Sequence, residues 1–257
     1  MSLVSRPLAA ALFAVVLALP AAAPARAQTF SADQRGEIEK IIKEYLLTHP
    51  ELMQDVMNEL EKKQATAEAE KHRATVKENS AAIFASPRQV TLGNPQGDVT
   101  VVEFFDYNCS YCKRAMGDML ELMKNDGKLK FVLKEFPVLG EGSVQAAQVA
   151  AAVRMQDKTG KKYLEFHQKL LGGRGQADKT RALAVAKEIG LDVARIEKDM
   201  AGDEVKATIE ESFKLAEALG LNGTPSYVVG TDVVIGAVGA NTLKEKINSA
   251  RCGKATC

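Results

Sequence analysis

The residues that decide the fold run from Glu103 to Cys112 and read EFFDYNCSYC. They begin inside an apolar, β-branched segment, 99–105, whose pattern is typical of a central strand buried on both faces. Helical spacing of apolar residues follows at 113–123, and a second strand pattern follows at 130–136. A strand, a helix and a strand of these lengths predict a βαβ unit with a right-handed crossover.

The rest of the C-terminal part predicts an α/β fold around this unit. A short strand is expected at 89–92. Two strands joined by a tight turn are expected at 226–229 and 233–235, followed by a helix at 241–250. Between the halves, residues 141–220 have helical patterns without a convincing strand, which predicts a helical insertion. Its expected helices span 144–155, 163–171, 180–189, 193–200 and 204–219.

Two cysteines, Cys109 and Cys112, are expected at the start of the helix that follows the first strand. There the first sulfur meets unpaired backbone N–H groups and the positive end of the helix dipole, which favour a thiolate over a thiol. Because the thiolate is the nucleophile in disulfide exchange, we expect Cys109 to attack and Cys112 to resolve the mixed disulfide. The spacing also suits a reversible disulfide between them.

Two other interpretations of this pair remain open. A zinc site would need four ligands, and Cys252 and Cys257 could supply two of them. However, these cysteines lie about 140 residues away, and none of the three histidines is near either pair in the sequence. A purely structural bridge would close so small a loop that it would add little stability. Redox chemistry is therefore the preferred interpretation, and no metal site is predicted.

The second pair, Cys252 and Cys257, follows the last predicted helix. Gly253 gives the turn between them flexibility, so we expect a small structural disulfide, with a labile or unpaired state as the alternative. A second catalytic centre is not expected, because neither sulfur opens a helix.

The quoted stretch, taken together with GTPSY at 223–227, resembles the DsbA-like branch of the thioredoxin superfamily over about residues 88–250. The resemblance implies a thioredoxin fold with a helical insertion, in a domain placed at 88–257, and a thiol–disulfide oxidoreductase without a cofactor. It implies a cis-proline at Pro225 against the sulfurs and backbone hydrogen bonds from Thr224 to an extended substrate. An ordinary turn at 223–225 remains the alternative.

The same resemblance places a buried acid at Glu103, where it could relay protons as Cys112 gains or loses charge. The alternative is a strand-end carboxylate that faces solvent.

Departures from the strongest oxidants of this family point to a particular activity. The active-site motif of those enzymes resembles Cys-Pro-His-Cys, whereas this chain has Ser110 and Tyr111 between its two cysteines. Tyrosine supplies no positive charge to stabilise the thiolate. We therefore expect a weaker oxidant, with a pKa of Cys109 that is lowered but stays above the roughly 3.5 of DsbA. Tyr111 and Thr224 resemble the disulfide-isomerase branch.

The expected function is thus a disulfide isomerase or reductase that acts on exported proteins with cysteines and depends on a membrane redox partner. One alternative is a net dithiol oxidase recycled by a quinone-linked membrane enzyme. A second alternative is a protein that binds copper or another soft cation.

The N-terminal part is predicted to be helical. Residues 28–60 contain two amphipathic helices, and residues 61–87 form a polar linker rich in Glu, Lys, Gln and Ala. The apolar stripes need partners, because isolated helices of this length are marginal in water. They could fold back on the domain, although self-association is favoured. This layout resembles the copper-sensitivity-suppressor C-like (ScsC-like) group, which implies a homo-oligomer, with a trimer favoured.

The first residues predict export. Arg6 precedes an apolar run, 8–19, and a small-residue stretch, 21–27, which together resemble a signal peptide spanning 1–27 and cleaved before Gln28. The expected location is therefore the periplasm. The chain has 34 basic and 33 acidic residues, and the expected signal peptide holds two of the basic ones, which leaves a net charge of −1. Nothing in this balance suggests nucleic-acid binding.

Overall fold

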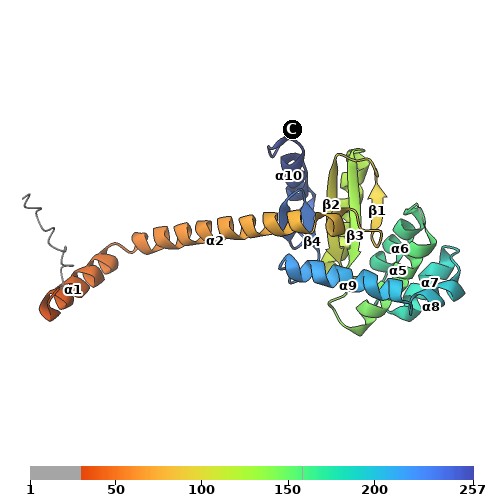
Figure 1. Ribbon diagram of the computed structural model, residues 1–257, viewed down its shortest axis with the longest axis horizontal. Helices are drawn as coiled ribbons and strands as arrows, with labels where there is room; N and C mark the ends of the chain where they lie inside the picture. Colours follow the sequence, from red (N-terminus) through yellow and green to blue (C-terminus); the bar gives the residue numbers. More distant parts are fainter. Residues whose placement is uncertain (1–29, 158) are drawn as a thin grey trace, which may run out of the picture. The chain divides into compact units, whose positions relative to one another are not determined.

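The structure is a computed structural model that describes residues 30–157 and 159–257 (Figure 1). The expected signal peptide, residues 1–27, lies outside the described residues. No helix within the described part of the chain has the length and apolar character needed to cross a membrane. The chain divides into two compact units that meet between Glu59 and Leu60.

The first unit contains helix α1, Ala32–Thr48, and the beginning of helix α2, Glu51–Glu78. Ser31 caps α1 through a capping box, in which its hydroxyl accepts from the Gln34 N–H while the Gln34 side chain accepts from the Ser31 N–H. Large apolar side chains in and next to these two helices are exposed between residues 30 and 60. These are Phe30, Ile38, Ile41, Ile42, Tyr45, Leu46, Leu47, Met53, Val56, Met57 and Leu60.

The second unit is built on a five-stranded sheet in the order β1-β3-β2-β4-β5. The strands are β1 Val90–Gly93, β2 Val99–Phe105, β3 Leu129–Glu135, β4 Ser226–Val229 and β5 Asp232–Ile235. Strands β2 and β3 are parallel, whereas the other neighbours are antiparallel. The parallel pair joined by a helix is the predicted βαβ unit, and the five-stranded mixed sheet agrees with the expected thioredoxin fold.

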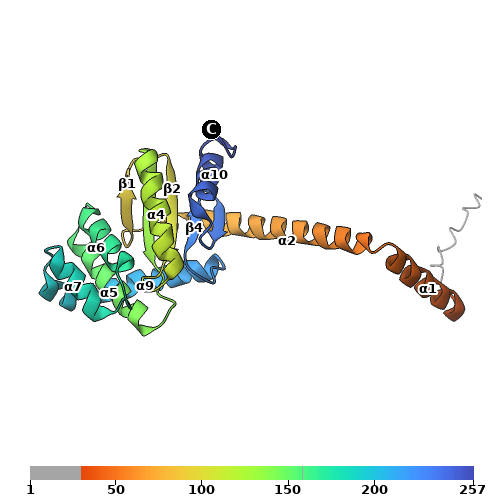
Figure 2. The ribbon, with the colours of Figure 1, turned by 180° about the vertical axis from the view of Figure 1, so that it is seen from behind.

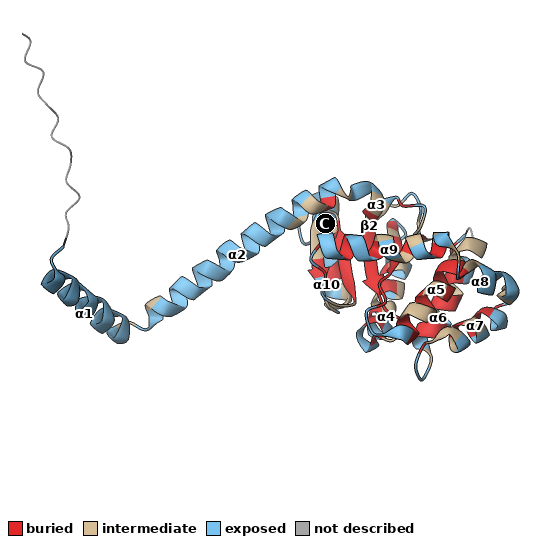
Figure 3. Ribbon diagram, turned by 60° about the horizontal axis from the view of Figure 1, so that its bottom comes forward, coloured by how far each residue is buried: buried red, intermediate tan, exposed pale blue. Residues whose placement is uncertain are grey.

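Helices cover both faces of the sheet, as the apolar pattern of β2 predicted. Helix α4, Ser110–Asn125, crosses one face (Figure 2), and α10, Gly239–Cys252, packs against α4. The opposite face is covered by α9, Asp203–Ala218, and the short helix α3, Ser80–Phe84 (Figure 3). The alternate side chains of β2 therefore enter two separate apolar clusters.

Between β3 and β4 the described residues form five helices, which agrees with the predicted insertion. They are α5 Glu141–Gln156, α6 Lys161–Gly172, α7 Lys179–Glu188, α8 Val193–Asp199 and α9. Helix α5 is at the centre and contacts the other four. Its alanine-rich face is buried (Figure 3), because the small side chains let neighbouring helices approach closely.

The segment before β1 is fixed to the sheet. Val76 and Ile83 are buried in the cluster that contains Val102, Phe104 and Val132. The polar linker was predicted to extend to residue 87, but its last residues pack on the domain because these two apolar side chains find partners on the face that α9 also covers.

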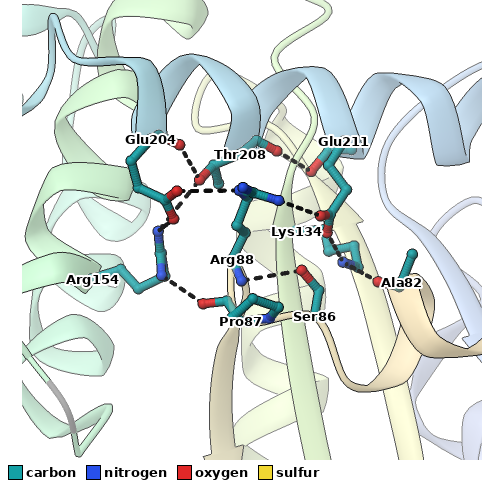
Figure 4. A network of polar contacts seen from close by, with 10 residues as sticks. Ala82, Ser86, Pro87, Arg88, Lys134, Arg154, Glu204, Thr208 and Glu211 are labelled. Atoms are coloured by element: carbon teal, nitrogen blue, oxygen red, sulfur yellow. Dashed lines mark hydrogen bonds and ion pairs between the residues drawn. The ribbon is translucent and has the colours of Figure 1, made fainter.

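A polar network reinforces this attachment (Figure 4). Arg88 binds Glu204 at 3.2 Å, and it also approaches Glu211 at 3.6 Å on the same helix, α9. Glu204 also accepts from Arg154 of α5, whose guanidinium donates to the carbonyl oxygen of Pro87. The network thus links the start of the domain to two helices of the insertion.

Lys134 of β3 belongs to the same network and its side chain is almost completely buried. Its ammonium donates to the Ala82 carbonyl oxygen at 2.8 Å and to Glu211 at 3.2 Å. Burial lowers the pKa of Lys134, and the nearby Glu211 carboxylate opposes that shift. The charged form therefore depends on Glu211.

The C-terminus is held by two further interactions. A disulfide of 2.07 Å joins Cys252 and Cys257. Just before it, Arg251 binds both Asp98 and Asp126, at 2.7 and 2.8 Å. These ion pairs attach the end of α10 to loops next to β2 and β3.

We predict that Glu211→Ala lowers the free energy of unfolding by about 2 kcal/mol, because the buried ammonium of Lys134 loses its carboxylate partner. Urea denaturation measures the change. Glu210→Ala is the matched control, since Glu210 pairs at 3.9 Å with an exposed lysine, and its loss should cost less than about 0.5 kcal/mol. Equal effects of the two substitutions would contradict the role assigned to Glu211.

Candidate active site at the start of helix α4

Cys109 is the N-cap residue of α4, which begins at Ser110. Its backbone is extended, and its Sγ accepts a hydrogen bond from the Cys112 N–H at 3.4 Å. The sulfur thus occupies the place where helices usually carry a serine, threonine or aspartate oxygen. This is the position that the sequence predicted for the first cysteine.

The two sulfurs have opposite tendencies to ionise. The Cys112 thiol, the Thr224 side chain and the backbone N–H groups of Cys112 and Tyr111 bind the Cys109 sulfur, and they lower its pKa to about 5 against the opposing effect of burial. Burial raises the pKa of Cys112 far above its ordinary value, and Cys109 adds to that shift. Cys109 keeps 7% of its surface exposed, whereas Cys112 has none. At neutral pH the site therefore holds one accessible thiolate.

A distant loop reaches the first sulfur. The Thr224–Pro225 peptide bond is cis, and the Cys109 sulfur lies 3.2 Å from the Thr224 carbonyl oxygen, to which it donates when it is protonated. The Pro225 carbonyl oxygen accepts from Gly236, which fixes the loop beside β5. The Thr224 N–H has no hydrogen-bond partner among the described residues. A backbone donor is therefore left beside the thiolate.

Glu103 lies inside the protein with only 3% of its surface exposed, so the solvent-facing alternative does not hold. It sits on β2 between Leu133 of β3 and Tyr227 of β4. Burial, together with the charges of Asp118 and Cys109, raises the pKa of Glu103 to about 8. The carboxyl group also raises the pKa of Cys112, so it is close enough to sense that sulfur.

The two residues between the cysteines face outward. Ser110 is exposed, and Tyr111 has 54% of its surface exposed. The guanidinium of Arg114 lies 4.7 Å from the centre of the Tyr111 ring, a cation–π distance. Tyrosine itself carries no charge, as expected, but the next turn of the helix brings a cation next to it.

Sequence reasoning missed two polar residues that hold the site together. The buried carboxylate of Asp106 accepts hydrogen bonds from the N–H groups of Asn108, Val138 and Leu139 and from the Ser143 hydroxyl. The Asn108 amide donates to Ser143 Oγ and the Ala177 carbonyl oxygen, and it accepts from the Ala177 N–H. A polar DYN triplet directly after a buried strand was the available signal.

A cavity of about 480 Å³ opens beside Cys109. Three loops line it, and none of their residues in the lining is charged. The lining residues are Asn108, Cys109, Ser110, Tyr111, Val138, Leu139, Asn222, Gly223 and Thr224.

The second pair of cysteines lies outside this site. Cys252 and Cys257 are bonded to each other, and the loop residues around Cys109 do not include them. Within residues 30–157 and 159–257 there is no cluster of three or more His, Cys, Asp and Glu side chains that could hold a metal ion.

Comparison with known protein families identifies the fold's relatives. Residues 100–248 match the family described as the DSBA-like thioredoxin domain. The chain belongs to this DsbA-like family. Residues 34–67 of this DsbA-like protein match a second family, the copper resistance protein ScsC N-terminal domain. Both matches confirm the resemblance drawn from the sequence.

Solved structures agree with this membership. The DsbA-like protein is 46% identical to a thioredoxin-like oxidoreductase from Silicibacter pomeroyi, with a TM-score of 0.64, over 67% of this chain and 98% of that one. It is 31% identical to the thiol-disulfide exchange protein alpha-DsbA2 from Wolbachia pipientis, with a TM-score of 0.65, over 71% and 97%. Proteus mirabilis ScsC shares the fold, at 24% identity and a TM-score of 0.63, over 87% and 98%.

Curated relatives extend the range of contexts. A probable disulfide bond formation protein D from Bacillus cereus is 26% identical over 60% of this chain and 75% of the relative. An Na⁺/H⁺ antiporter NhaA 1 from Salinispora arenicola is 27% identical over 65% of this chain. The DsbA-like chain spans about a quarter of the length of that antiporter. Sequence similar to this chain thus occurs in proteins of different length.

We predict that Cys109 of this DsbA-like protein titrates near pH 5 and that Cys112→Ala raises its pKa, because the Cys112 thiol is the largest favourable influence on the thiolate. Thiolate absorbance and pH-dependent alkylation of the reduced protein measure the shift. Because the folded pKa lies below that of an unfolded cysteine, this thiolate stabilises the reduced fold above the unfolded pKa. That contribution disappears as the pH falls through about 5. Titration of Cys109 like a free cysteine, near 8.5, would contradict the geometry.

Proposed function

We propose that the protein is a periplasmic disulfide isomerase or reductase that acts on exported proteins containing cysteines. The observation that carries this proposal is the single accessible thiolate at the start of α4, beside the unpaired N–H of Thr224. A client chain that adds its backbone to this loop would bring its own sulfur to Cys109. In this role Cys109 is the nucleophile, Cys112 the resolving cysteine, and Thr224 and Pro225 the substrate-binding residues.

The chemistry proceeds by two exchanges. The Cys109 thiolate attacks one sulfur of a client disulfide, an S–S bond forms to that sulfur, and the other client sulfur leaves as a thiolate. Reduction is completed when the Cys112 sulfur attacks Cys109, releases the client thiolate and leaves Cys109–Cys112 oxidised. Isomerisation occurs when a second client thiolate, instead of Cys112, attacks the client sulfur of the mixed disulfide. The client then gains a new disulfide, and Cys109 leaves as a thiolate.

Glu103 is suited to accept the proton that Cys112 must lose before it attacks. While Cys109 is a thiolate, its charge raises the pKa of Glu103. When Cys109 forms the mixed disulfide, that charge disappears and the carboxylate of Glu103 becomes easier to form. Glu103 therefore becomes a carboxylate base at the step in which Cys112 must lose its proton.

The residues between the cysteines favour an isomerase or reductase over an oxidase. Ser110 and Tyr111 supply no charge to the thiolate, and the pKa of Cys109, about 5, is higher than the roughly 3.5 of DsbA. When the Cys109 thiolate is less stabilised, the oxidised Cys109–Cys112 disulfide is more stable relative to the reduced form. The protein is then a weaker oxidant. A client joined to Cys109 in a mixed disulfide can then be released when its own cysteines form a new disulfide.

The N-terminal helical region, residues 28–60, is proposed to assemble the protein into a homo-oligomer, with a trimer favoured. Eleven large apolar side chains between residues 30 and 60 are exposed in the described chain, and residues 34–67 match the ScsC N-terminal domain. Several catalytic domains held together raise the local thiol concentration around one client. A membrane redox partner would keep Cys109 and Cys112 reduced, in a periplasm reached through the expected signal peptide.

The isomerase assignment predicts a reduction potential at or below about −180 mV for the Cys109–Cys112 pair, whereas an oxidase would lie near −120 mV. Equilibration with glutathione buffers measures this value. The full chain should reactivate scrambled ribonuclease, and residues 60–257 should keep thiol exchange but lose most isomerase activity and become monomeric.

Cys109→Ser is the control, because it should abolish both activities while the fold is retained. A monomeric full-length protein in light scattering, or isomerase activity that survives the deletion, would contradict the role of the N-terminal region. A potential near −120 mV would favour the oxidase alternative.

The role of Glu103 predicts that Glu103→Gln slows the release of a client from the mixed disulfide roughly a hundredfold, because Cys112 loses its proton acceptor. Single-turnover quench experiments separate this step from the attack by Cys109. Glu121→Gln on the exposed side of α4 serves as the matched control and should leave the rate unchanged. Equal release rates for the two variants would show that Glu103 carries no proton.

A further inference from the structure

Three cationic side chains meet at the loop between α6 and α7, residues 173–178. The ammonium of Lys113 on α4 donates to the Gly173 carbonyl oxygen at 3.0 Å. The guanidinium of Arg181 on α7 donates to the carbonyl oxygen of Arg174. Arg174 itself lies on the loop and is exposed. We call Lys113, Arg174 and Arg181 the basic loop cluster.

No ion pair neutralises the basic loop cluster within the part of the chain that the structure describes. Two of its cations donate to carbonyl oxygens, which carry no net charge. Asp178, the one acidic residue of the loop, caps α7 by accepting from the Arg181 backbone N–H. The guanidinium of Arg114, the residue after Lys113 on α4, lies over the ring of Tyr111 and adds a further positive charge. The loop is therefore surrounded by an excess of positive charge.

The cluster lies beside the nucleophile. The Lys113 N–H donates to the Cys109 carbonyl oxygen at 3.1 Å, which places Lys113 one helical turn beyond Cys109 on the same side of α4. That separation is about 6 Å along the helix axis. The Asn108 amide donates to the Ala177 carbonyl oxygen at 2.9 Å and accepts from the Ala177 N–H at 2.7 Å. Both ends of the loop are therefore attached to the segment that carries Cys109.

The sign of this charge selects the kind of polypeptide that approaches most readily. Fixed charges act over about 8–10 Å at physiological salt, so the cluster acts on residues that flank a client cysteine placed at Cys109. Charges of opposite sign raise association rates by roughly 10- to 1000-fold, whereas like charges oppose the approach. Because hydrogen bonds already order the loop, an acidic segment need not immobilise it on binding.

We propose that the basic loop cluster is a docking surface for acidic client segments, in which Asp or Glu residues flank the cysteine that Cys109 attacks. The inference rests on the proposed function, and it deepens that function by naming the client class. Cys109 binds the client sulfur, and Lys113, Arg174 and Arg181 attract the flanking carboxylates. The cluster thereby raises the rate at which acidic clients reach the thiolate.

The experiment compares the rates at which two peptides react with full-length protein carrying Cys112→Ser. Each peptide has one cysteine joined to thionitrobenzoate by a disulfide. Two Glu residues flank the cysteine on both sides in one peptide, and two Gln residues in the other. The Cys109 thiolate attacks the peptide sulfur, a mixed disulfide forms, and coloured thionitrobenzoate leaves as a thiolate.

Each rate constant is divided by the one for 2-mercaptoethanol and the same peptide at the same salt concentration. This division removes the effect of the flanking residues on the reactivity of the peptide disulfide. The measurements are made at about 0.01 M and about 1 M ionic strength, where the Debye length is about 30 Å and about 3 Å.

We expect the Glu peptide to react roughly tenfold faster than the Gln peptide at low salt, and less than about twofold faster at high salt. Arg174→Glu should reduce the low-salt ratio to below about twofold, whereas Arg174→Lys should keep it, because the charge is retained. Lys214→Glu is the matched control. Lys214 is an exposed lysine of α9, on the opposite face of the sheet from α4, and its substitution changes the net charge equally. It should leave the ratio at roughly tenfold.

Two results would overturn the docking surface while leaving the redox function intact. One is the release of thionitrobenzoate at equal rates from the two peptides at low salt. The other is a preference for the Glu peptide that survives Arg174→Glu or falls equally in Lys214→Glu. If Cys109 released no thionitrobenzoate from either peptide, the redox function would fail, and the docking surface with it.

Discussion

The site depends on the contact between the Cys109 sulfur and the backbone of the first turn of α4. The first amides of a helix need acceptors, and here one of them is met by a sulfur that gains stability as an anion. Cys112 contributes its own thiol to the same sulfur and remains protonated by burial. One helix end therefore gives its two sulfurs opposite tendencies to ionise, without a charged residue between the cysteines.

The buried sheet makes this arrangement possible. Strand β2 is covered on both faces, so it fixes the path of the chain to α4. It also places Glu103 close enough to the sulfurs to raise the pKa of Cys112 and to be affected by Cys109. The same burial raises the pKa of Glu103 to about 8, which is close to neutral pH. Directly after the strand, Asp106 gathers four donors and ties the cysteine loop to the β3–α5 loop.

The N-terminal part follows a different physical rule. Its helices form because caps and periodicity favour them, as the Ser31 capping box illustrates, but their apolar side chains stay exposed within the described chain. Apolar surface of this extent is costly in water, which is the basis for proposing self-association. Val76 and Ile83 differ from the earlier residues because the sheet offers them a hydrophobic cluster.

The sequence by itself determined the local elements: the β2–α4–β3 unit, the cysteine at the helix start, and five insertion helices within a few residues of their observed bounds. These features depend on neighbours within about four residues, whose periodicity is visible in the chain. The tertiary structure decided which distant groups meet. It brought Thr224 to Cys109 across 115 residues, directed the donors of residues 138, 139 and 143 to Asp106, and buried Val76 and Ile83. Such partners are selected by the packing of whole helices on the sheet, and no local pattern around Asp106 or Val76 encodes them.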